Sequence, residues 1–156
     1  MTEPAIKATE ESDIPALQKV LQETDLFPSD MLGDMLAPSL AGETDAFWLT
    51  CNLDGEAVGF CYTAHEALTD GTWNMLALAV HPKVQRKRLG AKLVRGAEQH
   101  LIGLKQRMLI IETSGSEDFA LAREFYTQNG FVEEARIRDF WANGDDKIVF
   151  RKVLGA

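Results

Sequence analysis

Apolar residues recur at helical spacing in four segments of the chain. The first of these helices is expected just after Ser12, which we take as its N-cap, with Pro15 in the tolerant first turn. The last is expected to end at Asn129-Gly130, a typical helix terminus. The four expected helices span about 14–21, 29–40, 89–101 and 119–126.

Shorter runs rich in strand-forming residues lie between these helices. Asn52–Gly55 reads as a hairpin turn between two of the runs, and Asn143–Asp146 reads as a turn between the last two. The expected strands span about 6–8, 46–51, 56–63, 73–80, 108–111, 131–138 and 147–153.

The order of elements is therefore β-α-α-β-β-β-α-β-α-β-β. Such an order predicts an α+β fold, in which helices pack on a mixed, mainly antiparallel sheet. With 156 residues, the chain suits a single domain over 1–156.

Two cysteines lie on the strands of the expected hairpin. If Asp54 and Gly55 form its turn, Cys51 faces Val58 and Cys61 faces Trp48, so the two thiols are not opposed. A disulfide is conceivable on this register, but we favour two buried free thiols in a cytoplasmic protein.

Composition narrows the classes of function. The net charge is −8, from 16 Lys+Arg and 24 Asp+Glu, which argues against nucleic acid as a partner. No apolar run is long enough to cross a membrane, and no secretory signal begins the chain. We therefore expect a cytoplasmic location, and no metal, since no His/Cys cluster has ligand spacing.

One basic stretch breaks this acidic pattern. Six of the 16 basic residues fall within 83–95, and 83–97 contains no Asp or Glu. The stretch spans a loop and a helix start, where unpaired N–H groups and partial positive charge favour phosphate. The alternative is a solvated basic face that balances an acidic protein.

Two segments carry a resemblance to the GNAT N-acetyltransferases. Leu76–Pro82 followed by Gln85–Ala91 resembles their signature, an apolar strand and then Q/R-x-x-G-x-G/A at a helix start, although Arg88 stands at the first glycine position. Ala122–Phe131 resembles their A-x-x-x-Y-x-x-x-G-F segment. The likeness covers about 45–154 well, and the first 45 residues in element order only.

The resemblance implies a GNAT fold, with about seven strands and four helices, that binds acetyl-CoA. The backbone of the strand would pair with pantetheine, and the amides of the loop would hold the pyrophosphate. Phe119 stands where the family often has an Asn that contacts pantetheine. The expected cofactor-binding residues are Leu78, Ala79, Val80, Gln85, Arg86, Lys87, Arg88, Leu89, Gly90, Ala91 and Phe119.

The resemblance also implies an acid and a base. Tyr126 would protonate the departing CoA thiolate, although a core aromatic is the alternative. Glu112 is our candidate base, although it could serve structure at a strand end. Some relatives carry a Glu early on the fourth strand, where this chain has Asn74. Five carboxylates in or near connections could attract a cationic amine or be merely solvated: Glu66, Asp70, Asp139, Asp145 and Asp146.

The expected function is direct transfer of acetyl from acetyl-CoA to a primary amine, either a small molecule or a peptide. Neither cysteine has an adjacent His that would favour a covalent intermediate. The alternative is a non-catalytic module of the same fold that binds acyl-CoA or another protein. Proteins of this fold often form dimers, so the resemblance also suggests a homodimer.

Overall fold

The computed structural model describes residues 3–155, and of Arg86 only the backbone. Its seven strands form one sheet in the order β1-β2-β3-β4-β5-β7-β6, and four α-helices occur within the described residues. The expected element order and mixed, mainly antiparallel sheet are confirmed. The chain forms two compact units, residues 3–64 with 76–100 and residues 65–75 with 101–155. None of the described helices is long and apolar enough to span a membrane.

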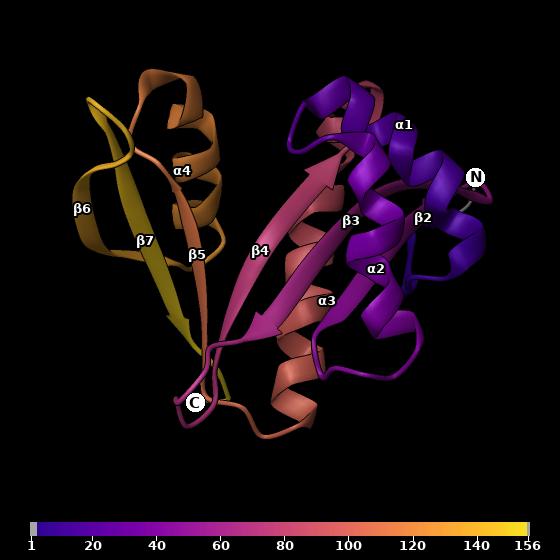
Figure 1. The fold of residues 1–156 in the computed structure, drawn as a ribbon, viewed down its shortest axis with the longest axis horizontal. Helices are drawn as coiled ribbons and strands as arrows, with labels where there is room; N and C mark the ends of the chain where they lie inside the picture. Colours follow the sequence, from indigo (N-terminus) through magenta and orange to yellow (C-terminus); the bar gives the residue numbers. More distant parts are fainter. Residues whose placement is uncertain (1–2, 156) are drawn as a thin grey trace. The chain divides into compact units, whose positions relative to one another are not determined.

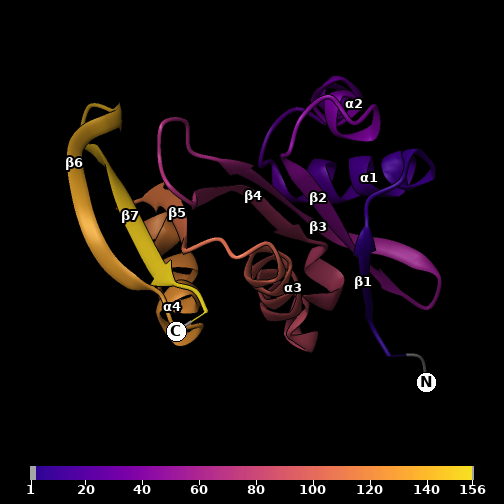
Figure 2. The same ribbon diagram turned by 90° about the horizontal axis from the view of Figure 1, so that it is seen from below.

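The first unit contains the N-terminal strands and helices (Figure 1). Helices α1 and α2 cover one face of strands β2 and β3, and α3 covers the other face (Figure 2). The element bounds are β1 (Ala5–Ala8), α1 (Ile14–Thr24), α2 (Leu32–Leu40), β2 (Phe47–Leu53), β3 (Glu56–His65), β4 (Thr72–Val80) and α3 (Leu89–Gly103).

Helix α1 begins two residues after the expected N-cap. Glu10 and Asp13 form the start instead, where the Asp13 carboxylate accepts the Glu10 N–H at 2.9 Å and a 3-10 turn, Glu11–Asp13, precedes the helix. Ser12 as N-cap is therefore wrong. Asp13 directly precedes the helix, and its carboxylate accepts the backbone N–H of Glu10. Pro15 lies in the first helical turn, as expected.

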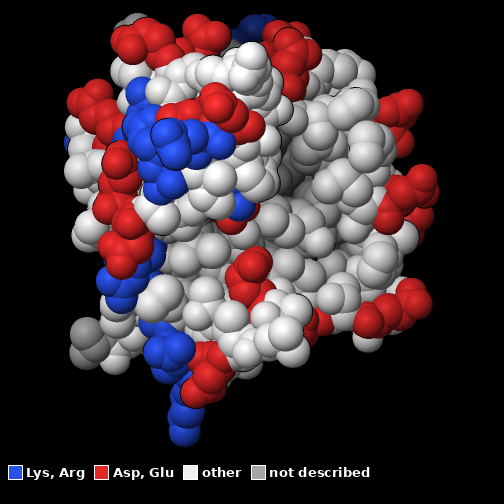
Figure 3. Space-filling view, turned by 60° about the vertical axis from the view of Figure 1, so that its left-hand side comes forward, with Lys and Arg blue, Asp and Glu red and all other residues white. Residues whose placement is uncertain are grey.

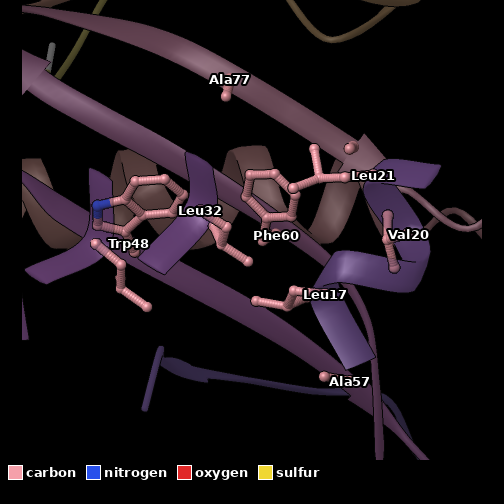
Figure 4. Packing of buried hydrophobic residues seen from close by; sticks show 10 residues of the cluster. Leu17, Val20, Leu21, Leu32, Trp48, Ala57, Phe60 and Ala77 are labelled. Atoms are coloured by element: carbon pink, nitrogen blue, oxygen red, sulfur yellow. The ribbon is translucent and has the colours of Figure 1, made fainter. Parts of the chain in front are cut away.

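The core of the first unit forms where the apolar stripes of α1 and α2 meet the sheet. Trp48 and Phe60 stack with ring centroids 5.7 Å apart, and leucines of both helices surround them (Figure 4). Phe60, Leu17 and Leu32 are fully buried. This core fixes β2 and β3, against which β4 is placed.

A β-bulge changes the register of the β2–β3 hairpin. Asp54 and Gly55 form the turn with positive φ, but the pairing shifts between Cys51 and Asn52. Cys51 therefore pairs with Gly59, and Cys61 pairs with Leu49. The expected pairs of Cys51 with Val58 and Cys61 with Trp48 are wrong, because the bulge absorbs one residue of β3. Both cysteines are buried and free, as expected.

The second unit has an antiparallel sheet covered by one helix. Strand β5 pairs with β7, and β7 pairs with β6. Parallel pairing joins Thr72–Asn74 of β4 to Met108–Ile110 of β5. The strand β6 extends beyond the expected residue 138, because only Asn143 and Gly144 are needed for the turn. The bounds are β5 (Met108–Ser114), α4 (Ala120–Gln128), β6 (Val132–Ala142) and β7 (Asp145–Val153).

Candidate active site

The loop between β4 and α3 is held by two side chains of its own. His81 caps the 3-10 helix Pro82–Lys87, since its Nδ1 accepts the Lys83 N–H at 3.2 Å. The Gln85 side-chain amide donates to the Val80 carbonyl at 3.0 Å. These bonds fix the shape of the loop and tie it to the end of β4.

Arg88 joins this loop to α3 in a left-handed conformation, with φ 61° and ψ 27°. Its side chain is exposed. A non-glycine residue disfavours a positive φ, and Arg88 adopts one nevertheless. A non-glycine residue in this region carries strain of about 1–3 kcal/mol. The turn that the family pattern gives to glycine is therefore kept here at an energetic cost.

Helix α3 begins directly after Arg88 with a buried anchor. Leu89 and Leu93 are fully buried. A ligand could therefore contact Leu89 only through its backbone. The first N–H groups of a helix lack intrahelical acceptors, and those of Leu89, Gly90 and Ala91 lie in this turn. The exposed cations of this segment are Lys83, Lys87, Arg88, Lys92 and Arg95. The Arg86 side chain lies outside the described part of the chain.

The end of β4 packs closely against β3 and α3. Ala79 and Val80 are buried, and Leu78 is half-buried. At Gly59 of β3, an added Cβ would lie 2.9 Å from the Ala79 carbonyl oxygen and 3.3 Å from Leu93. Gly59 is thus required for the position of this strand. Sequence reasoning missed it, since a lone glycine in a strand gives only a weak signal.

Tyr126 of α4 lies among aromatic side chains of the second unit. Its ring centroid is 5.5 Å from that of Phe150, 5.6 Å from Phe125 and 6.3 Å from Phe131. Burial raises the pKa of the Tyr126 phenol to about 12. The phenol is therefore protonated at neutral pH and can donate a proton or a hydrogen bond.

Glu112 of β5 is held in an ion pair. Its Oε2 lies 2.9 Å from the Lys147 ammonium, which also lies 4.2 Å from the Phe140 ring centroid. Both side chains are largely buried, so the pair is protected from solvent screening. The arrangement gives Glu112 a structural partner that the sequence did not predict, because Lys147 lies on a separate strand.

Strand register places Tyr126 and Glu112 on opposite faces of the sheet in the second unit. Ile111 pairs with Phe150, whose ring contacts Tyr126, so these side chains share the face that α4 covers. Glu112 follows Ile111 in the strand and points to the other face. Asn74 pairs with Ile110, two residues before Glu112, and shares the face of Glu112.

Phe119 and a surface hollow complete the description of the two units. Phe119, directly before α4, has 45% of its side-chain surface exposed, so its ring is available for contact. A hollow of about 530 Å³ lies at the connection between α1 and α2, with Asp25 as its charged residue. The hollow is lined by Leu21, Gln22, Asp25, Leu26, Phe27, Pro28 and Ser29.

Comparison with known proteins agrees with this fold and loop. The model of the acetyltransferase (GNAT) domain family matches residues 43–133, more than half of the chain. The chain therefore belongs to the GNAT acetyltransferases, and it is an N-acetyltransferase of that family. No curated protein matches the chain.

Solved structures give the same result. A protein of Desulfovibrio desulfuricans assigned to the GNAT family is 26% identical, with TM-score 0.88 over 98% of this chain and 100% of that one. The ribosomal-protein-S18-alanine N-acetyltransferase of Escherichia coli is 20% identical, with TM-score 0.77 over 99% and 96%. The yncA protein of Salmonella typhimurium, solved with its cofactor acetyl-CoA, is 16% identical, with TM-score 0.78 over 99% and 95%. The predicted GNAT fold is confirmed.

Proposed function

We propose that the protein transfers the acetyl group of acetyl-CoA directly to a primary amine. The loop between β4 and α3 carries this proposal, since it joins the first N–H groups of a helix to exposed cations in an otherwise acidic chain. Strand β4 extends six residues beyond Asn74, the last residue of its parallel pairing with β5. Its end, from Leu78 to Val80, is the segment that would pair with pantetheine.

The chemistry needs a neutral amine, a stabilised oxyanion and a proton for the thiolate. The Tyr126 phenol is protonated at neutral pH and would supply that proton. A backbone N–H near Val80 would stabilise the oxyanion. Glu112 stays our sequence-based candidate for the base, with its ion pair to Lys147 as the competing structural role.

A direct route is favoured over a covalent acetyl-enzyme. Cys51 and Cys61 are both buried, and burial raises the pKa of both thiols, to about 12 for Cys61. A thiol must ionise to attack a thioester, so neither cysteine is an activated nucleophile. The acceptor would be a small amine or a peptide amine.

Calorimetric titration with acetyl-CoA tests the cofactor. We expect micromolar binding that is lost in Gly90→Glu, which adds bulk and negative charge at the start of α3. Normal affinity in that variant would refute the pyrophosphate assignment.

A thiol-release assay then tests the transfer. Its panel consists of spermidine, kanamycin, a peptide with N-terminal alanine, a peptide with an internal lysine, and hydroxylamine. Binding of acetyl-CoA without turnover of any amine would favour the non-catalytic module.

A further inference from the structure

The start of β4 contains a buried amide with one free acceptor. Asn74 is 3% exposed, and its Nδ2 donates to Oε2 of Glu66 at 3.5 Å. Its Oδ1 is fully buried and has no hydrogen-bond partner among the described residues. A buried carbonyl without a hydrogen bond destabilises the fold, so such a group calls for a donor. A substrate amine or a water molecule would supply one.

The backbone of Glu66 is held in place by the connection from β3 to β4. The Glu66 N–H donates to the Thr72 carbonyl at 2.9 Å, and the Glu66 carbonyl accepts the Thr69 hydroxyl at 2.8 Å. The Thr72 N–H in turn donates to that hydroxyl oxygen at 3.2 Å. These bonds therefore restrain the backbone from which the Glu66 side chain extends.

The same connection is strained at its tip. Leu68 has φ 70° and is fully exposed. A leucine in this conformation gains no burial that would offset its strain, and such residues are concentrated at functional sites. The strain is consistent with a connection shaped for a role other than packing.

Glu66 also differs from Glu112 in its charge partners. Glu112 is paired with the Lys147 ammonium at 2.9 Å, whereas Glu66 has no ion pair among the described residues. The neutral Asn74 amide is the side-chain partner that the structure gives it. Glu66 therefore has a free negative charge that can attract an ammonium and accept its proton.

We propose that Glu66 accepts the proton of the acceptor amine and that Asn74 positions it; this inference rests on the proposed function. The substrate ammonium donates to Asn74 Oδ1 and to the Glu66 carboxylate. Its N–H bond breaks, the electron pair stays on nitrogen, and the proton passes to Glu66 and then to water. Within the second unit, Asn74 lies on the face of the sheet opposite to Tyr126.

The remaining steps of the transfer conserve atoms and charge. The nitrogen lone pair forms the bond to the acetyl carbon, the C–S bond breaks, and the thiolate takes the Tyr126 proton. The new amide nitrogen releases its second proton, and Tyr126 is reprotonated from solvent. One ammonium and one thioester thus give one amide, one thiol and one proton in solution.

The experiment compares Glu66→Gln with Glu112→Gln and with Glu56→Gln, an exposed carboxylate on the β2–β3 hairpin. The glutamine side chain in Glu66→Gln keeps an oxygen for the Asn74 amide but cannot accept a proton. We expect the kcat of this variant with the best cationic amine of the panel to fall roughly 100-fold, with acetyl-CoA affinity unchanged. Glu56→Gln should match the wild type in both measurements.

Hydroxylamine separates a chemical role from a structural one, because it is largely uncharged at neutral pH and needs no base before it attacks. Turnover of hydroxylamine by Glu66→Gln should stay within about twofold of the wild type, since no proton must be removed first. Asn74→Ala should show the same selective loss, at roughly 10-fold.

Three results would overturn the inference. These are equal loss with both nucleophiles, wild-type kcat in Glu66→Gln, or a selective loss in Glu112→Gln instead. A wild-type protein that turns over neither nucleophile would refute the proposed function, and this inference with it.

Discussion

Tyr126 shows how one residue combines packing with chemistry. Its ring fills space among Phe125, Phe131 and Phe150, as the core interpretation of the sequence requires. The same burial keeps its phenol protonated. The two interpretations of this residue are therefore compatible, because the apolar surroundings that bury the ring also favour the uncharged acid.

Removal of the Tyr126 hydroxyl should affect turnover far more than binding. Tyr126→Phe keeps the ring contacts and removes the proton, so kcat should fall at least about 10-fold while calorimetry finds nearly unchanged acetyl-CoA affinity. Turnover equal to the wild type would show that the thiolate departs without this acid.

The same residue predicts an effect of alkaline pH on stability. A folded-state pKa of about 12 exceeds the ordinary value of 10.0, so the protonated phenol is favoured in the folded protein. This contribution is complete below pH 10 and is lost as the pH rises through 12. In urea unfolding, Tyr126→Phe should lose less stability than the wild type on going from pH 9 to pH 11.

Arg88 offers a test of the strain in the loop. Arg88→Gly should raise the free energy of unfolding by about 1 kcal/mol, because glycine adopts positive φ freely. If the guanidinium also contacts phosphate, the same variant should bind acetyl-CoA more weakly, while Arg88→Lys keeps the affinity. Urea unfolding and calorimetry measure the two effects separately, and an unchanged midpoint would contradict the strain.

Predictions about single residues succeeded where the property depends only on the residue's own strand or helix. The burial of both thiols could be inferred from the strands on which they lie. The Lys147 partner of Glu112 and the amide contact of Glu66 could not, because each depends on strand register between distant segments.

At the scale of elements, the loop between β4 and α3 depends on the strands beneath it. Gly59 allows β3 to approach the backbone of Ala79. A side chain at this position would overlap the Ala79 carbonyl oxygen, and moving that backbone would disturb β4. The existence and order of the elements were predictable from periodicity. The bulge opposite Cys51 and Asn52 was not, because nothing in the alternation of β3 marks one extra residue.

Two glycine substitutions should have opposite effects. Gly59→Ala should destabilise the fold by about 1–3 kcal/mol, because its Cβ would overlap the Ala79 carbonyl. Gly33→Ala, in helix α2 with no atom within 4 Å of the new Cβ, should stabilise by about 0.5–1 kcal/mol. Thermal unfolding of both variants checks the pair, and equal shifts would contradict the packing argument.

At the scale of the whole molecule, the net charge of −8 contrasts with the basic stretch before and in α3. On the face drawn in Figure 3, Lys and Arg are bordered by Asp and Glu. The basic stretch 83–95 is thus a local exception in a chain of net charge −8. Because its described cations are exposed, acetyl-CoA affinity should fall several-fold between low and high salt. Calorimetric titration at several salt concentrations measures this dependence. An affinity that does not change with salt would contradict binding of the phosphates at the basic stretch.

Formation of a homodimer, expected from the sequence, stays a prediction for the whole molecule. All 11 residues of β6 are exposed, including Val132 and Trp141, so the strand edge is open to another chain. Sedimentation velocity should find twice the chain mass, and Ile137→Lys should shift the species toward the monomer. A wild-type monomer at high concentration would contradict the dimer.

Tyr126 and Asn74, the side-chain partner of Glu66, lie on opposite faces of one sheet, so the proposed reaction would exchange protons with water on two different sides. Each turnover would draw a proton from water on one side of the sheet and release protons on the other. The two relays share no carrier, so damage to one leaves the other intact. The fold-losses in kcat of Tyr126→Phe and Glu66→Gln should therefore multiply in the double variant. The two proton transfers would then contribute independently to the rate of acetyl transfer.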